Sequence, residues 1–167
     1  MLSRVANRLY WSARYLERSE GLARMINAYT HFILDTPKSA GVGWDVLISI
    51  IDAEPVYFSR YKKVTENNVI KFLLSDEENL ASLKASVSFA RENLRTTRDV
   101  LPEEAWELVN ELHLHTKLNV EEAVKRRNRY DFLDEIMLRN MQIDGLFDGS
   151  MNRDRSFEFI RLGRYLE

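Results

Sequence analysis

The chain has 167 residues, of which 45% are hydrophobic and 11% aromatic; this composition excludes a disordered protein and suffices for a single domain over residues 1–167. Its 24 basic and 26 acidic side chains leave a net charge of −2, so we expect neither nucleic acid nor an anionic membrane as a partner. The absence of cysteine excludes a disulfide framework, a thiol nucleophile and a thiolate zinc site. No apolar run approaches the roughly 18 residues of a membrane span, and we expect a cytoplasmic protein.

Long helices are expected, because only 6 glycines and 3 prolines interrupt the chain. The segment from Ser3 to Leu34 is apolar at helical spacing on two opposite sides. Such a helix must be covered on both sides, so we expect it at the centre of a bundle. One side carries the mostly apolar set Leu2, Val5, Leu9, Ala13, Leu16, Ala23 and Asn27, and the other carries Trp11, Tyr15, Leu22, Met25, Tyr29 and Ile33.

Shorter helices are predicted in the middle of the chain. Residues 44–61 are expected to form a helix that is interrupted at Glu54-Pro55, because proline disfavours helical conformation in the residue before it. A short helix is expected over residues 68–74. Asp76 is then predicted to cap a helix that runs to about Asp99.

Three more helices complete the expected fold. Pro102 is expected just inside the start of a helix that extends toward His115. Another helix is predicted over residues 130–143, with a break at 144–150, before a last helix that begins near Arg153 and is still running at Glu167. Because no alternating strand pattern is present, the sequence predicts an all-α bundle of about six helices.

The last residues repeat part of the first helix. Arg14-Tyr-Leu-Glu17 recurs as Arg164-Tyr-Leu-Glu167, and Ala13 aligns with Gly163. We therefore predict an internal repeat that starts near residue 153.

Charged side chains interrupt one apolar side of the first helix. Glu20 points into the apolar stripe, while Glu17 and Arg24 lie on its edge. Arg24 follows Glu20 by four residues, and Arg14 precedes Glu17 by three, spacings at which side chains meet on a helix. Carboxylates on a buried face must be paired, hydrogen-bonded or protonated. Two interpretations stay open: a glutamate–arginine network that fixes helix packing, and a site for an anion, a substrate or a cation.

A second polar stripe is expected on the helix before Pro102. Arg91, Arg95 and Arg98 lie on one side of it, with Glu92 beside them. This stripe is compatible with phosphate binding, and also with a face that is solvated or is paired with acids of a neighbour. The basic run at 125–129 is predicted to be solvated, because no aromatic residue is interleaved with it.

No known metal or cofactor motif is present. The Glu-x-x-His motif of di-iron bundles is missing, and His113 and His115 are two residues apart, so they point to different helix faces. We expect no metal and no cofactor. The candidate polar site therefore consists of Arg14, Glu17, Arg18, Glu20, Arg24, Arg91, Glu92, Arg95, Arg98, Arg164 and Glu167.

The opening from Leu2 to Arg24 resembles the N-terminal signature of the bacterial alpha-E domain family. The matching elements are Ser3-Arg-Val-Ala6, Tyr10-Trp11, Arg14-Tyr-Leu-Glu-Arg18 and Glu20-Gly-Leu-Ala-Arg24. A middle motif is similar at Ala90-Arg-Glu-Asn93, Arg95, Arg98, Trp106 and Asn110, and a second repeat at Met151, Arg153, Asp154, Phe159 and Leu162-Gly-Arg164. The chain departs from the family pattern at Ser19-Glu-Gly21 and at Leu94-Arg95.

The resemblance implies an all-helical domain that continues beyond Glu167, so this chain corresponds to about its N-terminal half. Family members are encoded next to, or fused with, circularly permuted ATP-grasp proteins and transglutaminase-like proteases. This implies an accessory or interaction domain for an ATP-grasp-type peptide ligase, with an ATP-grasp protein and a transglutaminase-like protein as partners.

Two alternatives are an enzyme whose buried glutamates act on a peptide or acyl substrate, and a structural helical scaffold. We also expect a homo-oligomer, a symmetric dimer, because the last helix carries apolar residues that further helices of the family domain would cover.

Overall fold

The computed structural model describes residues 2–167, which form eight α-helices, two short 3₁₀ turns and no strand. The all-α prediction is confirmed, with more helices than the six or so expected. The helices are α1 (Ser3–Asp35), α2 (Asp45–Ile50), α3 (Glu54–Arg60), α4 (Glu66–Leu74), α5 (Leu83–Arg95), α6 (Glu103–Ala123), α7 (Arg126–Ser150) and α8 (Arg155–Tyr165). Residues 44–61 divide into α2 and α3 because Asp52 adopts a left-handed conformation (φ 52°), ahead of the predicted break, and Pro55 lies in the first turn of α3.

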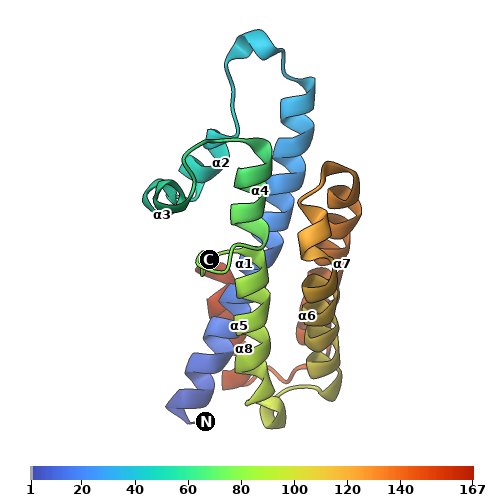
Figure 1. The fold of residues 1–167 in the computed structure, drawn as a ribbon. Coiled ribbons are helices and arrows are strands. Elements are labelled where there is room, and N and C mark those ends of the chain that lie inside the picture. The colour runs from blue at the N-terminus through green and yellow to red at the C-terminus, as the bar shows by residue number, and fades with distance from the viewer. Residues whose placement is uncertain (1) are drawn as a thin grey trace.

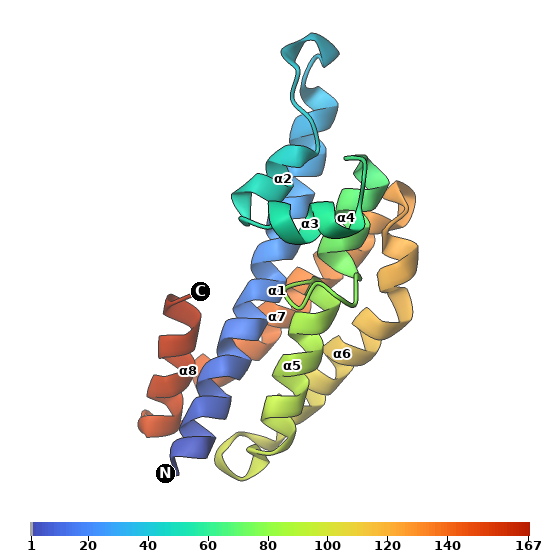
Figure 2. The ribbon, with the colours of Figure 1, turned by 60° about the vertical axis from the view of Figure 1, so that its left-hand side comes forward.

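The central position predicted for the first helix is confirmed. Helices α5, α7 and α8 pack on α1, and Figure 2 shows α8 on one side of it and α5 with α6 on the other. Leu9, Ala23 and Ile26 of α1 are completely buried in this core. The upper end of α1 extends beyond the bundle toward the loop that leads to α2 (Figure 1). The two apolar sides of α1 are thus covered by different helices.

Helix α7 is continuous over 25 residues, so the predicted break at 144–150 is wrong. Gly145 and Gly149 lie inside it, and each glycine costs a helix about 1 kcal/mol relative to alanine. Ile136, Ile143 and Phe147 are buried along one face of the same helix, where burial of each side chain contributes about 1.5–3 kcal/mol. The packed face therefore outweighs the two glycines.

The predicted capping role of Asp76 is also wrong. Ser82 caps α5, accepting a hydrogen bond from the backbone N–H of Ala85 at 3.3 Å, and α5 ends at Arg95 rather than near Asp99. Asp76 is instead a buried carboxylate that accepts hydrogen bonds from Tyr61 Oη at 2.6 Å and Arg60 Nε at 3.0 Å.

The basic run at 125–129 is not wholly solvated as predicted. Arg129 is 1% exposed and donates to Glu66 Oε1 at 2.9 Å and to the Val124 carbonyl oxygen at 2.8 Å. Arg126 contacts the other oxygen of Glu66. This cluster attaches α4 to the start of α7, which a local sequence pattern does not reveal.

Helix α8 begins after Asp154, whose carboxylate accepts hydrogen bonds from the backbone N–H groups of Ser156 and Phe157. It ends at Tyr165, so the expectation that it is still helical at Glu167 is wrong. It runs in the same direction as α1, with the two helices side by side (Figure 2). Gly163 lies against the backbone of Tyr10, which places the two Arg-Tyr-Leu-Glu segments next to each other.

Candidate functional site

The two Arg-Tyr-Leu-Glu segments are joined by ion pairs between α1 and the end of the chain. Arg14 Nε lies 2.7 Å from one carboxylate oxygen of Glu167, and Arg18 Nε lies 2.5 Å from the other. Burial alone would raise the pKa of Glu167, but the hydrogen bonds from Arg18 and Arg14 hold it below its ordinary value. Both predicted arginines therefore bind one predicted glutamate.

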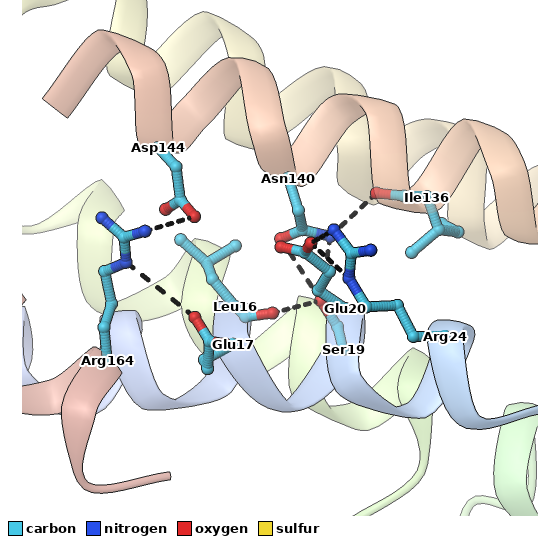
Figure 3. A network of polar contacts seen from close by, with 9 residues as sticks. All are labelled: Leu16, Glu17, Ser19, Glu20, Arg24, Ile136, Asn140, Asp144 and Arg164. Carbon is cyan, nitrogen blue, oxygen red and sulfur yellow. Dashed lines mark hydrogen bonds and ion pairs between the residues drawn. The ribbon is translucent and has the colours of Figure 1, made fainter. Parts of the chain in front are cut away.

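The pairing is reciprocal, because Arg164 reaches back toward α1 and α7. Its guanidinium lies 2.8 Å from Asp144 and 3.9 Å from Glu17 (Figure 3). It also lies 3.5 Å from Asp148. Each copy of the repeated segment thus supplies an arginine to a glutamate of the other copy. The result is a three-helix ion-pair network of α1, α7 and α8.

Glu20 lies on the side of α1 that faces α7 (Figure 3). It is 7% exposed, as its place in the apolar stripe predicts, and Arg24 Nε donates to it at 2.8 Å. The Arg24 side chain is 57% exposed, so the pair is not fully buried. Beside it, Asn140 of α7 donates to Ser19 Oγ at 3.2 Å and to the Ile136 carbonyl oxygen at 2.9 Å (Figure 3).

Asp144, like Asn140 and Asp148, belongs to this network but not to the candidate site predicted from the sequence, because a helix break is predicted at 144–150. Burial is the main cause that raises its pKa to about 6; Arg164 opposes the rise, whereas Glu20 and Glu17 add to it. Burial and the charge of Glu20 also raise the pKa of Glu17. The i, i+4 spacing of Asn140, Asp144 and Asp148 is the signal that would have placed them on one helix face.

A small pocket adjoins the ion-pair network. It measures about 270 Å³ and has apolar walls from Leu22, Met25 and Ile51, with Gly21 at its edge. Glu17, Arg18 and Glu167 line it as well. Among the candidate residues, Glu17 therefore has a raised pKa and also lines the pocket.

The second polar stripe is separate from this network. Arg91 and Arg95 both pair with Glu92, at 2.7 Å and 2.9 Å, and the Arg98 guanidinium lies 3.7 Å from the ring centroid of Trp106. Their charges are directed to neighbouring side chains, which matches the interpretation of a paired surface better than that of a phosphate site. Of Glu17, Glu20 and Arg91, only Glu17 lines the pocket beside the ion-pair network.

Within residues 2–167, no three acidic or histidine side chains are grouped as a metal ion would require. None of the helices in that part of the chain has the length and apolar character needed to cross a lipid bilayer.

Comparison with known protein families shows which family the chain belongs to. The model of the Alpha-E family, which is described as a predicted alpha-helical domain with a conserved ER motif, matches residues 1–167, the whole chain. The chain belongs to the Alpha-E family. No curated protein and no solved structure matches it. The resemblance inferred from the sequence is thereby confirmed, while its correspondence to an N-terminal half stays a prediction.

The Glu-Arg (ER) motif of this Alpha-E domain lies on α1. Glu17-Arg18 is the one Glu-Arg dipeptide in the chain. Glu17 faces Arg164, and Arg18 binds Glu167, so both residues of the dipeptide face the C-terminal segment. The motif thus lies at the junction of α1 with α8.

Proposed function

We propose that this Alpha-E domain is a non-catalytic interaction domain that assists an ATP-grasp-type peptide ligase, together with a transglutaminase-like protein. The observation that carries the proposal is the reciprocal pairing of Arg14 and Arg18 with Glu167 and of Arg164 with Glu17. Charged groups engaged in this way position α8 on α1 and keep that surface in one geometry. A rigid surface binds with a smaller loss of conformational entropy.

The family resemblance supplies the partners. Members occur beside ATP-grasp and transglutaminase-like proteins, whose combined chemistry is the synthesis and modification of peptides. An accessory domain in such a system needs a stable surface and no reacting group of its own.

An enzymatic role is the second candidate, and Asp144 and Glu17 favour it. A carboxyl group with a pKa of about 6 exchanges protons near neutral pH, as a general acid or base must. The pocket beside Glu17 offers space for part of a substrate. In a purely structural scaffold, the third candidate, the same network would serve helix packing alone.

The test uses the full chain and a purified ATP-grasp protein from the same organism. Isothermal titration calorimetry measures their binding, and ADP release reports ligase turnover with and without the chain. We expect binding, a change in ligase turnover, and no ADP release or peptide turnover by the chain alone.

Asp144→Asn and Asp148→Asn form a matched pair of variants, because both carboxylates face Arg164, and burial raises the pKa of Asp144 to about 6. Loss of turnover in Asp144→Asn with unchanged melting temperature, and retained turnover in Asp148→Asn, would favour the enzyme. If the chain neither binds the ligase nor changes its turnover, the result would favour the third candidate, a structural scaffold.

A further inference from the structure

An apolar groove runs between α1 and α8, outside the ion-pair network. It measures about 420 Å³ and is lined by Ser3, Ala6, Asn7, Tyr10, Phe159 and Leu162. On α8, Arg155, Phe159 and Leu162 follow at spacings of four and three, and Leu166, the residue that caps the C-terminus of α8, follows four residues later, so they share one face. Leu162 is 45% exposed and Leu166 is also exposed. This face is therefore apolar and open to solvent.

The groove has a basic end. Within residues 2–167, Arg4, Arg8, Arg153 and Arg155 have no carboxylate at ion-pair distance. Arg4 and Arg8 belong to the first turns of α1, and Arg155 is the first residue of α8. The arginines further along these helices, Arg14, Arg18 and Arg164, are all paired. Arg4 and Arg8 lie on other sides of α1 than the groove-lining residues, so Arg155, four residues before Phe159 on α8, is the positive charge without an ion-pair partner where the groove begins.

Helix α6 carries acidic rather than basic residues at one end of its outer face. Leu114 and Leu118 are exposed on its outer side, and Glu107 and Glu111 continue the same face toward its N-terminus. Among the residues that the structure describes, no basic side chain pairs with Glu103, Glu104 or Glu107. The outer face of α6 is therefore a helix stripe with exposed leucines and an acidic end.

The two faces have the same register. Glu107 precedes Leu114 by seven residues and Leu118 by eleven; Arg155 precedes Leu162 by seven and Leu166 by eleven. At 1.5 Å per residue, both faces place the charge about 10 Å from the first leucine. A parallel helix pair would bring the leucines together and the acid against the base.

We propose that the α1–α8 groove binds the outer face of α6 from a second copy of this chain. The contact pairs Arg155 with Glu107 and packs Leu162 and Leu166 on Leu114 and Leu118 of the neighbour. It is a helix-in-groove interaction in which the leucines supply burial and the charges fix direction.

The assembly is head-to-tail rather than two-fold symmetric. Helices α8 and α6 lie on opposite sides of α1, so one copy presents its groove and its α6 face in different directions (Figure 2). A two-fold contact through the groove alone would leave Arg155 of each copy without a carboxylate partner. The inference thus replaces the symmetric dimer expected from the sequence with an open chain of copies.

The experiment is sedimentation velocity of the full chain from about 1 μM to about 1 mM, because one helix in one groove buries less than a standard interface. Leu162→Asp blocks the groove, and Leu118→Asp blocks the α6 face. Leu80→Asp is the control at another exposed leucine; Leu118 and Leu80 are 77% and 65% exposed. Circular dichroism verifies that each variant is folded.

We expect the mass of the native chain and of Leu80→Asp to grow with concentration beyond a dimer, while each blocked variant stays monomeric. An equimolar mixture of the two blocked variants should form a one-to-one dimer and nothing larger, because it retains one intact groove and one intact face. A monomeric native chain, self-association of Leu118→Asp through its groove, or no dimer in the mixture would overturn the proposal.

Charge reversal tests the register independently of the leucines. Arg155→Glu or Glu107→Arg alone should weaken association about ten-fold, and the double reversal should restore it. Equal weakening in the single and double variants would contradict the proposed pairing.

Discussion

Gly163 is where α8 approaches α1 most closely, and its replacement by alanine tests the packing of the two repeated segments. An added Cβ would overlap the Tyr10 carbonyl oxygen and lie 2.9 Å from the Ala13 Cβ. The obstacle is backbone inside a long helix, which cannot rotate away as a side chain can. Helix α8 would have to move outward.

The expected change in the free energy of unfolding combines two opposing contributions. Alanine improves helix propensity by about 1 kcal/mol, whereas overpacking of a close contact costs about 1–3 kcal/mol. Outward movement of α8 also exposes part of Phe157 and Ile160, which are buried under it. We therefore expect Gly163→Ala to lower the free energy of unfolding by about 1–2 kcal/mol.

Thermal denaturation followed by circular dichroism measures this effect, and 1 kcal/mol corresponds to about 2–4 °C for a chain of this size. Gly145→Ala is the matched control, because it lies inside α7 with no atom within 4 Å of an added Cβ. The control should raise the melting temperature. A Gly163→Ala variant as stable as Gly145→Ala would refute the close approach of α8 to α1.

Three further outcomes are expected from the ion pairs. Glu167→Gln should lower the free energy of unfolding by about 1 kcal/mol, measured by urea denaturation, because it weakens the hydrogen bonds from two arginines; no change would mean that the contact is fully screened by solvent. Asp144 has a pKa raised from 3.8 to about 6, so its contribution to stability is present below pH 3.8 and lost as the pH rises through 6. The difference in unfolding free energy between the native chain and Asp144→Asn should change across that window, and a flat difference would contradict the raised pKa. Glu66→Ala should cost about 3 kcal/mol in the same denaturation assay because it leaves Arg129 buried without a carboxylate; a loss below about 1 kcal/mol would show that the Val124 carbonyl suffices.

Glu20 illustrates how much of the candidate site can be predicted from the local sequence pattern. Its burial and its pairing with Arg24 follow from helical periodicity on α1 alone. The partners that come from other helices do not follow, because Asn140 and Asp144 are more than a hundred residues away. The sequence likewise does not show how α1 and α5 pack, and the structure places Arg91 in a separate cluster with Glu92.

The sequence by itself determined the helical class, the length and central place of α1, and the membership of the Alpha-E family. These follow from periodicity, from the scarcity of glycine and proline, and from motifs within short segments. Tertiary structure decided that α7 continues through Gly145, that Arg129 is buried, and that the two Arg-Tyr-Leu-Glu segments pair with each other. Each of these depends on contacts between segments that are distant in the sequence. The free energy of these contacts outweighs local helix propensity, and a short stretch of sequence does not reveal it.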